Sequence, residues 1–319
     1  MSPHVVQGKD SSFEKAIAIT PKNFPRHSTQ DLDNAFKLAG ELGKYSVFIF
    51  QWRELDIDTV KLMMNKSREY NLIPILGLSP TSLDQGRKEL DVPDWVRKKA
   101  GHNISFSNPV IRNEFINSAK RLAELRPAYL CLATEINFLA IQRLDEYLHF
   151  VNLYKEAYKE VKKISPQTKV FVSFQWEWIR IIDSKEIHKI KDHAKVINIF
   201  KPELDLVGLT TYPSAFHDSP SKLPNDYYSW VYNHIDRKDT VIFMETGWPT
   251  SGTGNEAEQK DYIKRLPKLL ETVNASIVAW ALLHDVNLDA FDENLNTVGL
   301  LTNNGRKKSA FDAFKLLNR

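Results

Sequence analysis

Cysteine is almost absent from this 319-residue chain, which has only Cys131. A single cysteine excludes an intrachain disulfide, and its position within an apolar stretch predicts a buried thiol. No apolar run reaches 18 residues, so the sequence predicts no transmembrane helix. Residues 1–12 are polar and lack the apolar centre of a secretion signal, and we expect them to form a disordered tail. A full-length chain would then stay in the cytoplasm, but a secreted protein whose signal had been removed would look the same.

Several motifs of common catalytic sites are also missing. The chain has no H-x-H, H-E-x-x-H or cysteine cluster for a metal, and no G-x-S-x-G elbow for a serine hydrolase. The net charge is +3 and the basic residues are scattered, which disfavours nucleic acid and anionic membranes as partners. We therefore expect a protein without metal or cofactor, and a monomer.

Short apolar segments alternate with helical patterns along the whole chain, and residues 144–161 form the clearest amphipathic helix. A charged helical stretch is expected at 184–199. The expected strands are residues 16–20, 45–50, 72–78, 129–134, 169–174, 204–211, 240–243 and 276–282. Eight alternating strand–helix units predict a parallel (β/α)8 TIM barrel in one domain, residues 1–319. A doubly wound open sheet is the alternative, but no strand is followed by a G-x-G-x-x-G or P-loop motif.

Two glutamates end segments that are predicted to be buried strands. Glu245 follows residues 240–243 and precedes a turn containing Gly247 and Pro249, while Glu135 follows residues 129–134. A lone glutamate at such a position usually points to water or pairs with a lysine. Two of them, on the fourth and seventh strands of a barrel, can face each other across its mouth. Glycoside hydrolysis uses such a carboxylate pair, and their separation decides between retention and inversion.

Tryptophans gather at the same strand ends. Five of the seven lie at or just beyond an expected strand: Trp52, Trp176, Trp178, Trp248 and Trp280. Aromatic faces suit stacking on sugar rings, although loop packing over the barrel mouth is the usual role of any single one. The five together favour a carbohydrate cleft. The long segment 81–107 after the third strand is expected to shape that cleft, because long loops in compact domains are usually functional.

With these motifs in place, the chain resembles clan A of the glycoside hydrolases. The Glu-Thr-Gly-Trp-Pro turn at Glu245 is similar to that of family 53 endo-β-1,4-galactanases and family 17 β-1,3-glucanases. Tyr212 resembles the clan's tyrosine near the nucleophile, Trp280 resembles its eighth-strand tryptophan beneath the sugar, and residues 298–301 with 305–306 resemble the closing segment of family 53. The resemblance implies a retaining mechanism with Glu135 as acid/base and Glu245 as nucleophile.

One position departs from the clan pattern. Thr134 stands where the clan usually has an asparagine that binds the sugar 2-hydroxyl, and a threonine hydroxyl is shorter and has one donor instead of two. The resemblance also suggests Arg53 as the clan's second-strand arginine. We expect the substrate to contact eight residues in all: Trp52, Arg53, Thr134, Asn137, Trp176, Tyr212, Trp248 and Trp280.

The main hypothesis is a retaining β-glycoside hydrolase that acts on a β-linked oligo- or polysaccharide. The alternative is a glycan-binding barrel with weak or lost catalysis, motivated by Thr134. A third possibility, a barrel enzyme such as an aldolase or isomerase, is disfavoured because no well-placed lysine ends a strand and no glycine-rich phosphate loop follows the seventh or eighth. Turnover of aryl β-glycosides separates the first two.

Overall fold

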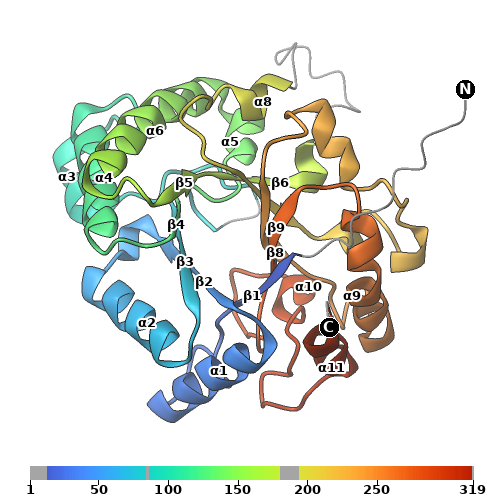
Figure 1. Cartoon of the computed structure of the whole chain (residues 1–319). Helices are drawn as coiled ribbons and strands as arrows, with labels where there is room; N and C mark the ends of the chain where they lie inside the picture. The colour runs from blue at the N-terminus through green and yellow to red at the C-terminus, as the bar shows by residue number, and fades with distance from the viewer. Residues whose placement is uncertain (1–12, 84–85, 180–193, 318–319) are drawn as a thin grey trace, which may run out of the picture.

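The computed structural model describes residues 13–83, 86–179 and 194–317, in which the strands form a ring enclosed by helices (Figure 1). The expected tail at 1–12 lies outside the described residues. The same holds for most of the charged stretch at 184–199, of which α8 (Ala194–Asn198) is described. Within the described part of the chain, no helix combines the length and apolar character needed to cross a membrane.

The strands are all parallel and follow one another around the ring in the order β5-β4-β3-β2-β1-β9-β8-β7-β6. They are β1 (Glu14–Ala18), β2 (Tyr45–Gln51), β3 (Ile73–Ser79), β4 (Tyr129–Cys131), β5 (Lys169–Phe171), β6 (Ser173–Gln175), β7 (Val207–Thr211), β8 (Val241–Thr246) and β9 (Ala275–Trp280). Only Val172 separates β5 from β6, so these two segments are halves of the fifth barrel strand. Because β5 pairs with β4 and β6 pairs with β7, the ring closes, which confirms the predicted TIM barrel.

The helices lie outside this ring (Figure 1). They are α1 (Thr29–Leu42), α2 (Ile57–Glu69), α3 (Asp94–Ala100), α4 (Pro109–Glu124), α5 (Asn137–Gln142), α6 (Leu144–Ile164), α9 (Glu256–Leu270), α10 (Glu293–Asn296) and α11 (Ser309–Leu316). Side-chain caps start several of them: Ser28 forms a capping box with Asp31 at α1, and Asn108 precedes Pro109 at α4. Before β8 the chain forms a short 3-10 helix, η4 (Ser229–Asn233).

Two apolar layers form the core, as the alternation of side chains along each strand requires. The barrel interior is filled by Ala16, Tyr45, Val47, Ile75, Cys131, Phe171, Leu206, Ile242, Met244, Ile277 and Ala279. Cys131 is fully buried, as predicted. The neighbouring residues of each strand face outward and pack under the helices in a larger second cluster.

The strands become irregular toward their carboxyl ends. Leu209 pairs with Phe243 but Thr210 pairs with Glu245, so Met244 is an extra residue in β8. Such a bulge re-aims the side chains that follow it. It brings Glu245 level with Thr210 at the barrel mouth. Close packing continues at Gly208, where a β-carbon would lie 2.8 Å from the carbonyl oxygen of Val172, at the junction of β5 and β6.

Candidate active site

Glu135 and Glu245 lie at the carboxyl ends of the fourth and seventh barrel strands, β4 and β8. Glu135 has a left-handed backbone with φ of 51°, which is uncommon for a residue other than glycine. Its backbone N–H donates to the hydroxyl of Ser173 on β6 at 3.1 Å. Strained backbone of this kind is held by its surroundings and concentrates at functional sites.

Both oxygens of the Glu135 carboxylate have a donor. The Thr210 hydroxyl donates to Oε1 at 2.7 Å, and Arg87 Nε donates to Oε2 at 2.6 Å. The Arg87 and Glu135 side chains are only 12% and 10% exposed, so this ion pair is shielded from water. Arg87 Nη1 also donates to the hydroxyl of Ser79, at the end of β3, at 3.0 Å. The carboxylate of Glu135 is therefore held by one cation and one neutral donor.

Glu245 has different surroundings, because its partner is a neutral phenol. The Tyr212 hydroxyl donates to Glu245 Oε2 at 2.5 Å. Although the side chain is partly exposed, the protein packed around its carboxylate disfavours the charged form. This desolvation and the negative charge of Glu135 raise the pKa of Glu245 to about 7, against the lowering effects of Tyr212 and Arg87. The two carboxylates thus interact and lie in different environments, and around neutral pH Glu245 carries a proton in part of the molecules.

Tyr212 remains a hydrogen-bond donor over the working pH range. Its burial, followed by the charge of Glu245, raises the pKa of the phenol well above its usual range. A phenol that keeps its proton donates to the carboxylate of Glu245 and favours that ionised form.

Four of the expected sugar-stacking tryptophans are core residues instead. Trp52, Trp176, Trp248 and Trp280 are each 1% exposed or less. Trp52 Nε1 donates to Ser118 Oγ on α4 at 3.0 Å, and Trp280 Nε1 donates to the carbonyl oxygen of Val298 at 2.8 Å. Stacking requires an exposed ring face, so the expectation of platforms at these four positions is corrected.

Of the remaining expected contact residues, two are buried and one forms ion pairs at the surface. Thr134 is fully buried, and its hydroxyl has no hydrogen-bond partner among the described residues. Asn137 is fully buried too, and its amide bonds both backbone groups of Gln175, at 3.0 and 2.8 Å. Arg53 lies 3.5 Å from Asp91 and 3.7 Å from Asp94. Thr134 and Asn137 face no solvent and are therefore not presented to a substrate as expected. Arg53, which follows β2, is tied to the segment after β3, but its side chain is 47% exposed and its contact with substrate stays a prediction.

The structure adds three residues that the sequence analysis missed. Arg87 and Thr210 contact Glu135. Glu177 contacts Tyr212: the backbone N–H of Tyr212 donates to Glu177 Oε2 at 3.1 Å. Glu177 had the same signal as Glu135, a carboxylate just beyond a buried strand segment. Arg87 had none, because it lies in an irregular, mixed-charge segment.

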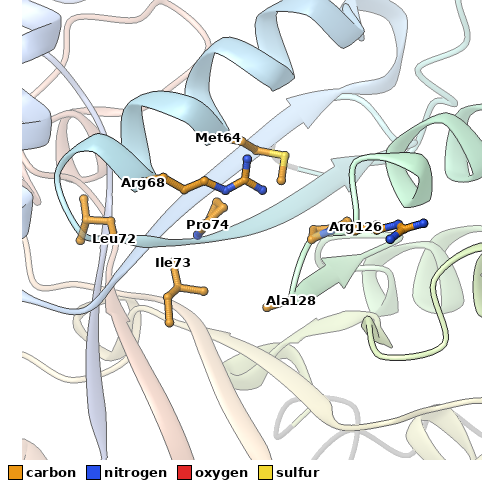
Figure 2. A pocket seen from close by; sticks show the side chains of 8 residues that line it. Met64, Arg68, Leu72, Ile73, Pro74, Arg126 and Ala128 are labelled. Atoms are coloured by element: carbon orange, nitrogen blue, oxygen red, sulfur yellow. The ribbon is translucent and has the colours of Figure 1, made fainter.

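The described residues contain no group of three or more His, Cys, Asp or Glu side chains arranged to hold a metal ion. Two hollows of about 210 and 570 Å³ lie at the opposite end of the barrel, where β3, β4 and β5 begin. Figure 2 shows the smaller one, with Arg68 from α2 and Arg126 from the turn before β4 among its lining. Active sites of TIM barrels lie at the carboxyl ends of the strands, so neither hollow belongs to the glutamate pair.

Comparison with known proteins agrees with this fold. No family model matches the chain, and no curated protein matches its sequence. The barrel of a GH5_18 enzyme variant from Streptomyces cattleya, in complex with Manβ1-4GlcNAc, is similar, with a TM-score of 0.73 at 15% identity over 95% of this chain and 79% of that chain. The exo-β-1,4-mannosidase from Opitutaceae bacterium strain TAV5 gives 0.71 at 14% identity, over 95% of this chain and 58% of that one.

Xylanase 10B from Thermotoga maritima gives a TM-score of 0.65 at 12% identity, with 96% of this chain and 94% of that chain covered. These neighbours are TIM-barrel glycoside hydrolases of clan A. Specific similarity to families 53 and 17, expected from the turn at Glu245, is not shown by them. At such low identity the likeness establishes the barrel fold, and the activity has to be inferred from the site.

Proposed function

We propose that this protein is a retaining β-glycoside hydrolase that acts on a β-linked oligo- or polysaccharide, with Glu135 as acid/base and Glu245 as nucleophile. The observation that carries the proposal is the interacting carboxylate pair at the ends of the fourth and seventh barrel strands, in which burial and the charge of Glu135 raise the pKa of Glu245 to about 7. The hydrolase activity of similarly folded barrels supports it.

In the first step, Glu135 protonates the glycosidic oxygen while Glu245 attacks the anomeric carbon and forms a covalent glycosyl-enzyme. In the second step, Glu135 removes a proton from water, which attacks the same carbon and releases Glu245. The Tyr212 hydroxyl stabilises the Glu245 carboxylate before attack and after release. Glu135 is held in an ion pair with Arg87, and the raised pKa of Glu245 leaves a proton on Glu245 in part of the molecules. Substrate binding therefore has to release Arg87 and transfer that proton from Glu245 to Glu135, which leaves Glu245 ionised for the first step.

The second candidate is a glycan-binding barrel with weak or lost catalysis. It is favoured by the same Arg87–Glu135 ion pair, since a carboxylate held by a guanidinium cannot serve as an acid until that contact breaks. The burial of Thr134, at the position of the clan's sugar-binding asparagine, points in the same direction.

A screen of β-linked polysaccharides and aryl β-glycosides separates the two candidates. We expect turnover, with the β-anomer as the first product seen by proton NMR. A first product of α configuration would show inversion and contradict the assigned mechanism. Binding to a glycan without turnover of any substrate would favour the binding protein.

Azide rescue then tests the two roles separately. The Glu135→Ala variant should cleave an aryl glycoside with a good leaving group and, with azide, give the β-glycosyl azide from the covalent intermediate. The Glu245→Ala variant has no nucleophile, so azide should attack directly and give the α-glycosyl azide. The opposite pair of products would exchange the roles of the two glutamates.

A further inference from the structure

We propose that Glu177, a buried carboxylate outside the reacting pair, is a positioning residue that holds Tyr212 and β8 so that Glu245 keeps its nucleophilic form. Its role in catalysis rests on the proposed function. Glu177 follows β6 and is 2% exposed. Among the described residues no cation pairs with it, and its oxygens accept four hydrogen bonds from neutral donors.

The first connection runs through Tyr212. Glu177 Oε2 accepts the backbone N–H of Tyr212 at 3.1 Å and the amide of Gln175 at 2.6 Å. The other end of the same tyrosine donates its hydroxyl to Glu245 at 2.5 Å. Because neither N–H group can reverse its role, Oε2 has to remain an acceptor for both bonds to persist. A carboxylate at position 177 therefore fixes the backbone from which Tyr212 reaches Glu245.

The second connection is a chain of buried hydroxyls that ends beside Glu245. Glu177 Oε1 accepts from Tyr227 at 2.9 Å and from Thr211 at 2.5 Å. From Thr211 the chain continues through Tyr228, Tyr262 and Thr246, with contacts of 3.0, 2.6 and 2.6 Å. Thr246 directly follows Glu245 in β8, and these hydroxyls are buried. Burial raises the pKa of Glu177, while the bonds from Thr211, Tyr212 and Tyr227 act to lower it. In its ionised form Glu177 only accepts, so it orients every hydroxyl in the chain toward itself.

Two variants separate the position of this carboxylate from its charge. Glu177→Asp keeps the charge but is one methylene shorter, so it draws back from the N–H of Tyr212. Glu177→Gln keeps the length: its oxygen can accept from Tyr212 and Gln175, while its NH2 group donates to hydroxyls that are able to reverse. A positioning role predicts a larger change in the pKa of Glu245 for Glu177→Asp than for Glu177→Gln.

The readout is the pKa of Glu245, measured by ¹³C NMR of protein labelled at glutamate Cδ and assigned with Glu245→Gln. The other charged groups acting on Glu245 are Glu135 and Arg87, and both are unchanged in these variants. Loss of the Tyr212 bond removes an effect that lowers this pKa, so Glu177→Asp should raise it above about 7. Glu177→Gln should shift it less, and Tyr212→Phe should shift it at least as far as Glu177→Asp.

Rates give the matching test. A rise of one pKa unit lowers kcat/KM about tenfold on the acidic side of the profile, because the ionised nucleophile becomes tenfold scarcer. The double variant Glu177→Asp/Tyr212→Phe should be no worse than Tyr212→Phe alone.

Positioning is overturned if Glu177→Asp lowers the melting temperature but leaves the pKa of Glu245 unchanged. It is also overturned if the losses of kcat/KM in Glu177→Asp and Tyr212→Phe add up in the double variant. The NMR titration needs no turnover. An unchanged pKa therefore refutes positioning, whereas a shifted pKa in a protein without hydrolysis refutes the hydrolase and leaves the positioning contact supported.

Discussion

Replacing Tyr212 by phenylalanine should move the pH dependence of hydrolysis toward alkaline pH. The change removes one hydroxyl, whose bond to Glu245 is 2.5 Å long and lowers the pKa of that carboxyl. A hydrogen bond to a charged group contributes roughly 1.5 to 3 kcal/mol, and one pKa unit corresponds to about 1.4 kcal/mol. The pKa of Glu245 should therefore rise from about 7 by about one to two units.

The assay is a profile of kcat/KM against pH on an aryl β-glycoside. Because the nucleophile has to be ionised, the acidic limb should move by the same one to two units, with a loss of about ten- to a hundredfold near pH 6. Activity should recover as the pH rises above the new pKa. Tyr154→Phe is the control, since Tyr154 is a buried tyrosine of α6 whose hydroxyl has no hydrogen-bond partner among the described residues. An acidic limb that stays in place in Tyr212→Phe would refute the assigned contact.

Three further outcomes are expected. Thr134→Val should raise the melting temperature and leave kcat/KM unchanged. The buried Thr134 hydroxyl has no partner among the described residues, and such an unpaired group destabilises the fold by about 1 to 3 kcal/mol, which the valine removes. Thr210→Val is the control and should lower kcat/KM, because it removes the hydrogen bond to the Glu135 carboxylate. A loss of kcat/KM in Thr134→Val would instead support the sugar-binding role of Thr134. Lys308→Met should destabilise the fold by about 3 to 5 kcal/mol in thermal or urea unfolding, since it strands the buried carboxylate of Asp285, 2.7 Å from Lys308 Nζ; an effect below ~1 kcal/mol would contradict the assigned ion pair. The pKa of Glu245 is raised from 4.5 to about 7 on folding, so the stability of the wild type falls as the pH rises through that window. The glutamine in Glu245→Gln cannot ionise, so this variant should gain stability relative to the wild type in that pH window, by at most about 3 kcal/mol. It should also lose hydrolysis and keep glycan binding. Equal pH dependence of the two proteins in urea unfolding would count against the raised pKa of Glu245.

The sequence predicted the barrel because its signals are local and repeated. Each expected strand is a short apolar segment with a helical pattern after it, and parallel βα units of that number close on themselves. The placement of Glu135 and Glu245 at strand ends follows from the same segmentation. None of this depends on the conformation of a loop.

The tryptophans show where position along the chain is insufficient. Ala279 faces the barrel interior, so the alternation of β9 turns Trp280 outward, under the helices, where it packs in the outer core. Ending a strand places a residue at the mouth but does not decide which side of the sheet it faces. For Glu245 the simple alternation would also have been misleading, because Met244 already faces inward and only the bulge brings Glu245 level with Thr210. Arg87 depends on an irregular segment that has no period to interpret.

Trapping the covalent intermediate tests the central claim most directly. A 2-deoxy-2-fluoro β-glycoside with a good leaving group, of a sugar that the wild type hydrolyses, should inactivate the enzyme. Mass spectrometry of a protease digest should then find one glycosyl group on the peptide that contains Glu245, and Glu245→Gln should acquire none. A label on Glu135, or steady hydrolysis of the matching unsubstituted glycoside with no labelled peptide, would contradict the account.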